Sequence, residues 1–155
     1  MSVTRYDGFT RLLHWVMALL ILSQFVKFVE YIDGGEEWFK GTFGPFHGSV
    51  GFVILVLAVI RIVWAVLQCG KRPALTGKGA VLASLGHKAL YAGMVALPLT
   101  GIFKLVGNGW GLRVFDAQLI ARGEEIAWMA SLGEWHAPLS WALAIMVVGH
   151  IVMGL

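Results

Sequence analysis

The sequence predicts an all-α integral membrane protein, a four-helix bundle with both termini in the cytoplasm. Two observations support this prediction. Hydrophobic residues make up 58% of the 155-residue chain and charged residues only 14%, which lies outside the usual composition of water-soluble domains. The apolar residues also form four long runs, each able to cross a bilayer core of about 30 Å at about 1.5 Å per residue. Residues 1–155 are therefore expected to form a single transmembrane domain.

The four predicted spans cover residues 12–29, 47–67, 87–106 and 135–155. Turn-forming glycines follow the first three runs: Gly34, Gly70 and Gly107. The first run contains Ser23 and Gln24 and is not followed by a small-residue cleavage site, so we interpret it as a retained span and not as a signal peptide. The longest connection, residues 107–134, is expected to contain a short interfacial helix at residues 126–132.

The charged residues predict the orientation of the spans. The loops on one side hold half of the twelve basic residues: Arg5, Arg11, Lys71, Arg72, Lys78 and Lys88. The other side has fewer basic residues (Lys40, Arg113 and Arg122) and every acidic residue except Asp7. Because basic loops stay on the cytoplasmic side, both termini are predicted to lie there. The net charge of +3 reflects this topology, and we expect no nucleic-acid partner.

All five histidines lie in or at the ends of the predicted spans: His14, His47, His87, His136 and His150. An ionisable side chain at membrane depth is costly unless it has a partner or a cavity. Hydrogen bonding between helices would explain any one of them. It explains all five together less well.

The fourth predicted helix carries two histidines at different depths. His150 follows His136 by fourteen residues, and fourteen steps of about 100° return to within about 40° of the same face after a rise of about 21 Å. His47 begins a helix at the outer end of the bundle, and His14 begins one at the inner end. Depth therefore pairs His136 with His47 and His150 with His14.

Each pair could hold one metal ion between two helices. Haem iron fits better than zinc or copper, because each level offers two imidazoles without a thiolate or carboxylate, whereas structural zinc takes four ligands. The sequence has no C-x-x-C-H motif and one cysteine, so a haem would be bound non-covalently. We therefore expect two haem b groups, an outer one on His47 and His136 and an inner one on His14 and His150.

Glycines beside the proposed ligands are further candidates for cofactor binding. Gly48, Gly51 and Gly149 would allow the backbone to approach a flat porphyrin closely. Ordinary packing of small residues between helices explains these glycines equally well.

Three cations within the spans are candidates for contacts with charged groups. Arg61 could pair with a propionate of the inner haem. Lys27 and Lys104 approach the outer surface, where they could hold propionates or attract an anion. Snorkelling to the membrane surface is the alternative for all three.

Four stretches of the sequence carry a family resemblance: RLLHW around His14, FHGSVGFVILVLAVIRIV around His47, LGHKALYAGMVALPLTG around His87 and EWHAPLSWALAIMVVGH from Glu134 to His150. They resemble the prokaryotic diheme cytochrome b561 family, which is related to the b-type membrane subunits of formate dehydrogenase and nickel-iron hydrogenase. The resemblance covers nearly the whole chain. It implies a multi-pass protein of the bacterial inner (cytoplasmic) membrane, with bis-histidine haems ligated by the first, second and fourth helices.

The resemblance also implies electron exchange with a membrane quinone as substrate. In short stand-alone members, the implied activity is oxidation of superoxide at the outer face with reduction of ubiquinone. His87 would then handle quinone or protons, with Tyr91 and Arg61, although a structural role is the alternative. Relatives carry a further basic tail beyond the position where this sequence ends, Leu155.

The sequence is compatible with three functions. The first is a quinone-linked oxidoreductase acting on superoxide, against which the acidic outer loops count unless Lys27 and Lys104 dominate locally. The second is a haem-bearing anchor and electron conduit within a larger oxidoreductase complex, whose acidic outer face docks a redox partner subunit. The third is a haem-free structural membrane protein. The sequence favours the first slightly over the second.

Overall fold

The computed structural model describes residues 5–71, 73, 77 and 79–154. Four helical segments within it are long and apolar enough to cross a membrane, which confirms the predicted four-helix membrane bundle. They are α1 (Gly8–Gln24) with its continuation η1 (Phe25–Tyr31), α3 (Gly44–Leu67), α4 (Ala80–Gly107), and α6 (His136–Gly154) preceded by α5 (Ala127–Gly133). Three residues used in the sequence predictions lie outside the described part of the chain: Arg72, Lys78 and Leu155.

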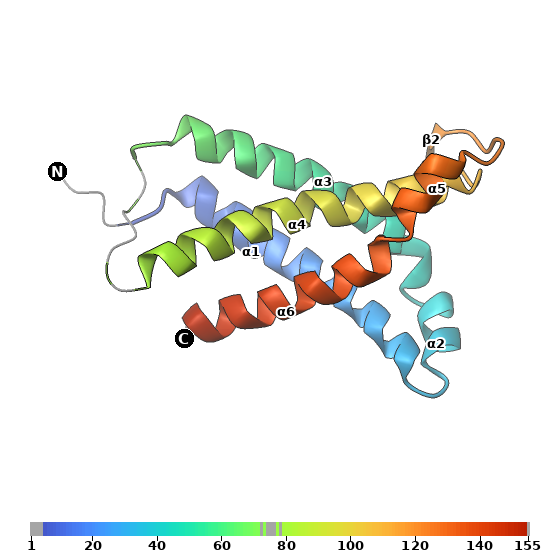
Figure 1. Ribbon diagram of the computed structural model, residues 1–155, viewed down its shortest axis with the longest axis horizontal. Coiled ribbons are helices and arrows are strands. Elements are labelled where there is room, and N and C mark those ends of the chain that lie inside the picture. The colour runs from blue at the N-terminus through green and yellow to red at the C-terminus, as the bar shows by residue number, and fades with distance from the viewer. Residues whose placement is uncertain (1–4, 72, 74–76, 78, 155) are drawn as a thin grey trace.

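The helices run up and down between two ends of the molecule. The start of α1, the end of α3, the start of α4 and the end of α6 lie together at one end (Figure 1). The short helix α2 (Gly35–Gly41), α5 and a β-hairpin lie at the other end. Below, we name the first the inner end and the second the outer end, following the orientation that the charges predict.

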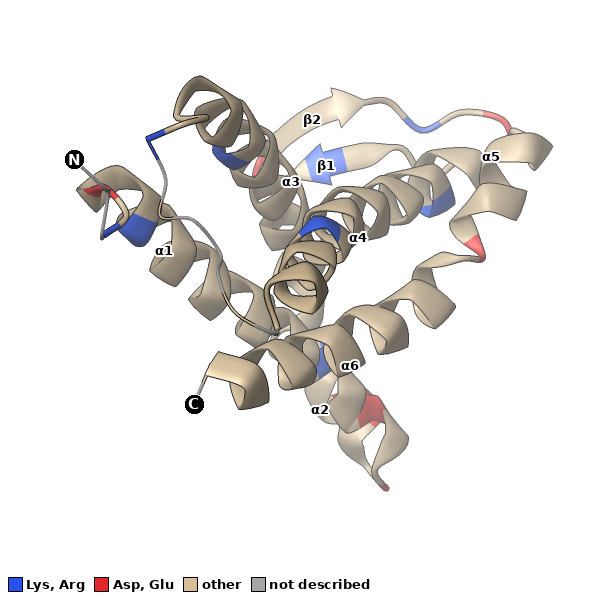
Figure 2. Cartoon of the chain, turned by 60° about the vertical axis from the view of Figure 1, so that its left-hand side comes forward, with Lys and Arg blue, Asp and Glu red and all other residues tan. Residues whose placement is uncertain are grey.

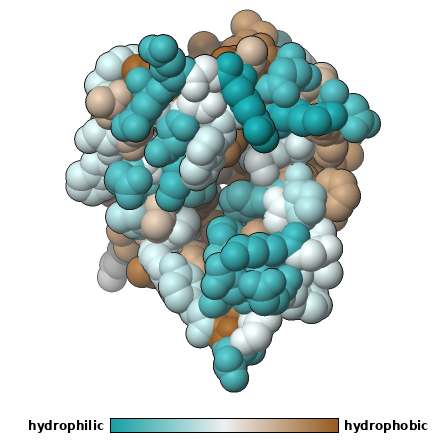
Figure 3. Space-filling model, turned by 90° about the vertical axis from the view of Figure 1, so that its right-hand side faces the viewer, coloured by the Kyte–Doolittle hydropathy of each residue, from teal (hydrophilic) through white to brown (hydrophobic). Residues whose placement is uncertain are grey.

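The outward surfaces of the long helices are apolar. Leu19 is 68% exposed, Leu82 61% and Ile145 70%. Charged residues gather towards the helix ends and the connections (Figure 2), and hydrophilic residues cover much of the outer end (Figure 3). Because a water-soluble monomer rarely exposes so much contiguous apolar surface, these faces are suited to lipid.

The protein core lies where α1, α3 and α4 meet. Its buried residues are Met17, Ile21, Ile54, Ala58 and Met94. The helix α6 packs against α4, whereas extensive close backbone packing of α6 on α1 or α3 is absent from the described residues. Side chains bridge part of this distance, since the Trp141 ring of α6 lies 4.3 Å from the Phe28 ring of η1, and a cavity lined by residues of α1, α3 and α6 takes up another part.

The inner end of α1 is tied to α3 by polar side chains. Asp7 caps α1 by accepting a hydrogen bond of 2.9 Å from the Thr10 backbone N–H, and the Thr10 hydroxyl also donates to it. The Trp64 indole N–H lies 3.3 Å from the same carboxylate. These hydrogen bonds, those of Thr10 first, lower the pKa of Asp7 because they stabilise its ionised form.

The structure differs from the sequence predictions at several boundaries. The third long helix begins at Ala80 instead of residue 87, because the small and apolar residues 80–86 continue it towards the inner end. The first ends in the 3₁₀ segment η1. The interfacial helix expected at residues 126–132 is present as α5. The short helix α2 was not predicted.

A two-stranded antiparallel hairpin in the loop before α5 was also not predicted. It consists of β1 (Leu112–Val114) and β2 (Ala117–Ile120). Tertiary contacts hold it: Leu112 is buried, and the Phe115 backbone N–H donates a 2.7 Å hydrogen bond to the Ser49 hydroxyl of α3. Strands this short carry too little alternation to be recognised from sequence.

Candidate functional site

The first candidate site lies at the outer end, where two histidines face each other. His47 belongs to the first turn of α3, and His136 is the first residue of α6. Their ring centroids are 6.1 Å apart. Two imidazoles that bind one metal ion from opposite sides should have centroids about 6.4 Å apart, given a metal–nitrogen bond of about 2.0 Å and a ring radius of about 1.2 Å. The observed spacing fits a shared iron.

The ring of His136 is held in place by α4. Its Nδ1 lies 3.0 Å from the Leu97 carbonyl oxygen and 3.5 Å from the Thr100 hydroxyl. Because a carbonyl oxygen only accepts, Nδ1 must carry the proton. The other nitrogen, Nε2, is then the one available to bind a metal, as is usual for metal-binding histidines.

A glycine of α4 makes room for this ring. A Cβ on Gly101 would lie 3.0 Å from the His136 Cε1 atom, closer than ordinary packing allows. Sequence reasoning missed Gly101, Leu97 and Thr100. In the sequence, Leu97 and Gly101 are four residues apart and therefore lie on one face of a predicted helix. This spacing does not indicate which neighbouring helix that face contacts.

A cavity of about 270 Å³ lies beside the outer pair and is partly open to the surroundings. Its lining includes both histidines and the apolar side chains Ile54, Met94 and Leu143. This volume is near the lower end of the range of about 300 to 1,000 Å³ for small-molecule sites. Apolar walls between two imidazoles suit a flat, largely apolar group.

Both outer cations predicted from the sequence line this cavity. Lys27 and Lys104 contribute to its wall together with Glu30. Lys27 forms an ion pair with Glu30, and its ammonium group lies 4.8 Å from the centre of the Phe39 ring. Part of the charge of Lys27 is therefore already balanced, whereas the described residues include no carboxylate paired with Lys104.

The second candidate site lies at the inner end. The ring centroids of His14 on α1 and His150 on α6 are 6.2 Å apart, almost the same spacing as in the outer pair. The ring of His87 on α4 lies 5.5 Å from that of His150. The inner end therefore has three neighbouring imidazoles. The His14–His150 distance is closer than the His87–His150 distance to the value expected for two ligands of one iron.

Arg61 lies beside the inner pair. One guanidinium nitrogen is 3.3 Å from the His14 Nδ1, and Nε donates to the Tyr91 hydroxyl at 3.3 Å. The guanidinium also lies 5.6 Å from the centre of the Tyr91 ring. Arg61 thus connects two residues predicted to act at the inner end.

The three glycines predicted beside the ligands have different surroundings. An added Cβ on Gly51 or Gly149 would meet no atom within 4 Å, so both positions border open space. Gly51 also lines the outer cavity. A Cβ on Gly48 would lie 3.8 Å from Leu105, which fits ordinary helix packing.

The donor set suits haem better than a bare metal ion. Across the described ranges, no three or more His, Cys, Asp or Glu side chains are placed to hold a metal ion together. Zinc and similar ions need such a set, whereas a porphyrin supplies four nitrogens of its own and needs only two axial ligands. The residues present therefore fit haem at both ends.

A bundle of apolar helices with facing imidazole pairs defines a class of protein, the membrane cytochromes b. The family model of prokaryotic cytochrome b561 matches residues 5–155, and the chain belongs to this family. It is 26% identical to the Escherichia coli (strain K12) protein named cytochrome b561 homolog 2, over 97% of this chain and 83% of that protein. The chain is accordingly a membrane protein that transfers electrons through haem b. This excludes the third function considered above, a haem-free structural membrane protein.

Proposed function

We propose that the chain binds two haem b groups, one between His47 and His136 and one between His14 and His150. The observation that carries this proposal is the equal spacing of the two pairs, 6.1 and 6.2 Å between ring centroids, at opposite ends of α6. Bound haem supplies one-electron redox chemistry. The protein's own contribution is to hold the ligand rings, exclude water with apolar walls and place charges around each site.

We propose that a membrane quinone exchanges electrons at the inner end. Three side chains support this assignment: His87 and Tyr91 on α4, and Arg61 on α3. Tyr91 and Arg61 are hydrogen-bonded to each other, and His87 lies beside His150. Together they offer donors to a carbonyl oxygen and groups able to pass protons, which quinone chemistry needs.

For the electron donor, we favour superoxide arriving at the outer end. The supporting observation is that Lys27 and Lys104 line the cavity of the outer pair, where cations would attract an anion towards it. We further propose that the protein lies in the bacterial inner membrane with its inner end in the cytoplasm, as the basic loops indicate.

The alternative is an electron-conducting subunit anchored to a larger oxidoreductase complex. Acidic residues of the outer end favour it, including Glu36 and Glu37 on α2, because such a face would dock a basic redox partner. Isolation of the chain only within a stable multi-subunit complex would establish this function over the first.

The deciding experiment is a reduced-minus-oxidised spectrum with haem quantitation on purified protein. We expect two haems per chain, with loss of the outer haem in His47→Ala and of the inner haem in His14→Ala. If both variants keep two haems, the ligand assignment is wrong. If the intact protein is not reduced by superoxide, the favoured donor is wrong even when both haems are present.

A further inference from the structure

The hairpin contacts α3 beside the turn that carries His47, and the function proposed above gives this contact no role. The Phe115 backbone N–H donates a hydrogen bond of 2.7 Å to the Ser49 hydroxyl, 66 residues earlier in the chain. Ser49 is a polar residue that is only 5% exposed. It follows His47 by two residues, about 200° around a helix, so the hairpin supports α3 from the side opposite the imidazole.

This hydrogen bond comes from a strained turn. Phe115 has a φ of +50°, the only positive φ of a residue other than glycine in the described part of the chain. Residues with a side chain disfavour this conformation, which persists only where the surroundings hold it. Burial does not hold it, because Phe115 is 52% exposed. The contact with Ser49, together with the pairing of β1 and β2, therefore keeps the turn in this shape.

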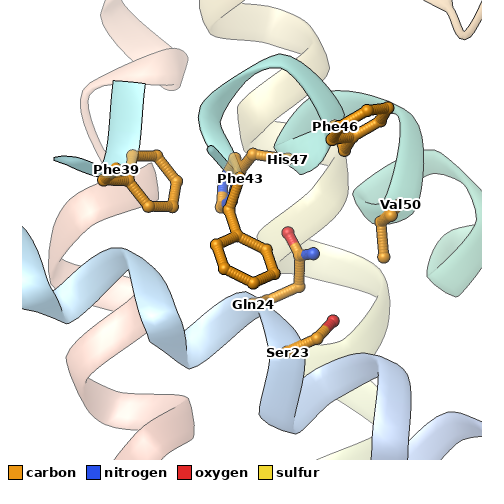
Figure 4. Close-up of a pocket in the computed structure, with 7 residues that line it drawn as sticks. All are labelled: Ser23, Gln24, Phe39, Phe43, Phe46, His47 and Val50. Carbon is orange, nitrogen blue, oxygen red and sulfur yellow. The ribbon is translucent and has the colours of Figure 1, made fainter. Parts of the chain in front are cut away.

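The start of α3 has few other polar contacts. Its N-cap residue, Phe43, makes no side-chain hydrogen bond to the helix, and uncapped helix ends leave backbone N–H groups without partners. The rings of Phe39, Phe43 and Phe46 lie around His47 (Figure 4). No hydrogen bond joins the His47 ring to another residue in the described ranges, whereas the ring of His136 is bonded to α4. The orientation of His47 therefore depends on the backbone of α3.

The segment that follows the hairpin leads to the other outer ligand candidate. Helix α5 lies so close to the end of α4 that a Cβ on Gly133 would be 2.5 Å from the Lys104 Cα. His136 follows Gly133 by three residues. One connection thus contacts α3 at Ser49, packs on α4 and positions the start of α6. It holds the two outer histidines relative to each other, and their ring planes stand at 90°.

We infer that Ser49 is a positioning residue of the outer haem site. By accepting the Phe115 N–H, it fixes the start of α3 and keeps the His47 ring at a right angle to the ring of His136. The inference rests on the proposed function, because it takes both histidines as ligands of one iron. The angle between two axial imidazole planes changes the EPR g values of a ferric low-spin haem. A turned His47 ring therefore has a spectroscopic signature that a general loss of stability does not have.

The test uses the full haem-loaded chain in phospholipid nanodiscs, with EPR spectra of the oxidised protein and transfer of each haem to apomyoglobin as readouts. In Ser49→Ala, we expect the g values of the outer haem to shift and those of the inner haem to stay the same. The outer haem should leave about tenfold faster, as loss of one hydrogen bond of about 1.4 kcal/mol would predict. Ser49→Thr keeps the hydroxyl and should retain the signal of the intact protein.

Two substitutions at Phe115 test the same contact from the hairpin side. Phe115→Gly keeps the N–H and suits the positive φ, so the outer haem should behave as in the intact protein. Phe115→Pro removes the N–H without altering a residue of α3, and should reproduce the effect of Ser49→Ala. Because Phe115 is an exposed position, Phe115→Pro decides the question even if Ser49→Ala does not fold.

Ser131→Ala is the matched control, because Ser131 is exposed on α5 and has no side-chain hydrogen bond to another described residue. Both haems should remain unchanged in it. Haem quantitation keeps the two proposals apart, since an intact chain with fewer than two haems, or an outer signal that survives His47→Ala, contradicts the proposed function. With two haems present, the inference is overturned if Ser49→Ala and Phe115→Pro leave the outer haem unchanged, or if they alter both haems equally.

Discussion

The inner and outer ends of the bundle place imidazole pairs at nearly the same spacing but surround them differently. At the outer end, His136 donates to the neutral carbonyl of Leu97. At the inner end, His14 meets the guanidinium of Arg61. An acceptor on the ligand ring makes the ring a stronger electron donor and stabilises oxidised iron, whereas a nearby cation stabilises reduced iron. The comparison teaches that ring spacing suits both sites to the same cofactor, while the neighbours differentiate them.

This difference gives the proposed electron path a direction. A lower potential at the outer haem and a higher one at the inner haem would carry electrons from the outer end towards the quinone proposed at the inner end. Of the cations near the outer pair, Lys27 is balanced by Glu30, whereas Lys104 has no paired carboxylate among the described residues and reduces the difference between the two potentials.

The largest expected effect comes from closing the space that holds His136. Gly101→Leu should eliminate the outer haem and leave the inner one, because the added side chain would occupy the position of the ring. Haem quantitation with separate spectra for the two haems measures this. Gly86→Ala is the control on the same helix, where an added Cβ meets no atom within 4 Å, and both haems should remain. Equal loss of both haems in Gly101→Leu would argue for general misfolding.

The second prediction removes the charge that distinguishes the inner end. Arg61→Gln should lower the potential of the inner haem by on the order of 100 mV, because a unit charge about 5 Å away contributes about 3 kcal/mol at an effective dielectric constant of 20 before screening. Redox titration of both haems measures the shift. Arg61→Lys keeps the charge and should change the potential less. A shift confined to the outer haem would refute the assignment of Arg61 to the inner site.

The third prediction tests which cation serves the outer end. Lys104→Ala should slow reduction of the outer haem by superoxide about tenfold at low salt, and added salt should shrink the difference. Stopped-flow rates over a range of ionic strength measure this. Lys40→Ala should have little effect, because Lys40 lies on α2 and is paired with Glu36 at 2.6 Å. Equal rates in both variants would favour the partner-subunit alternative.

The smallest effect concerns the inner cap of α1. The pKa of Asp7 is lowered in the folded protein by its hydrogen bonds from Thr10, so its charge stabilises the fold above the ordinary pKa of aspartate. This contribution is lost as the pH falls through the lowered pKa. Asp7→Asn keeps a capping side chain but does not titrate. Thermal unfolding should show a slightly higher melting temperature for the intact protein than for Asp7→Asn at pH 7, and this difference should disappear in acid. A difference in melting temperature that persists in acid would exclude the charge of Asp7 as its cause.

Parts of both candidate sites could be predicted from the sequence, because depth in a membrane follows position along a helix. The rise per residue places His136 and His150 at opposite levels of α6, and the structure brings each beside the predicted partner. The surroundings of the rings could not be predicted in the same way. The contacts of Gly101 with His136 and of Arg61 with His14 depend on how neighbouring helices are rotated and how far apart they stand.

That the chain crosses a membrane in four helices follows from the sequence alone, because the length and composition of the apolar runs do not depend on how the helices pack. The sequence also determined the level at which each histidine lies. Three features depend on tertiary packing: α6 packs its backbone mainly on α4, Arg61 contacts His14, and the hairpin attaches to Ser49. These features arise from side chains distant in sequence that meet only after the helices have packed, so no local pattern predicts them.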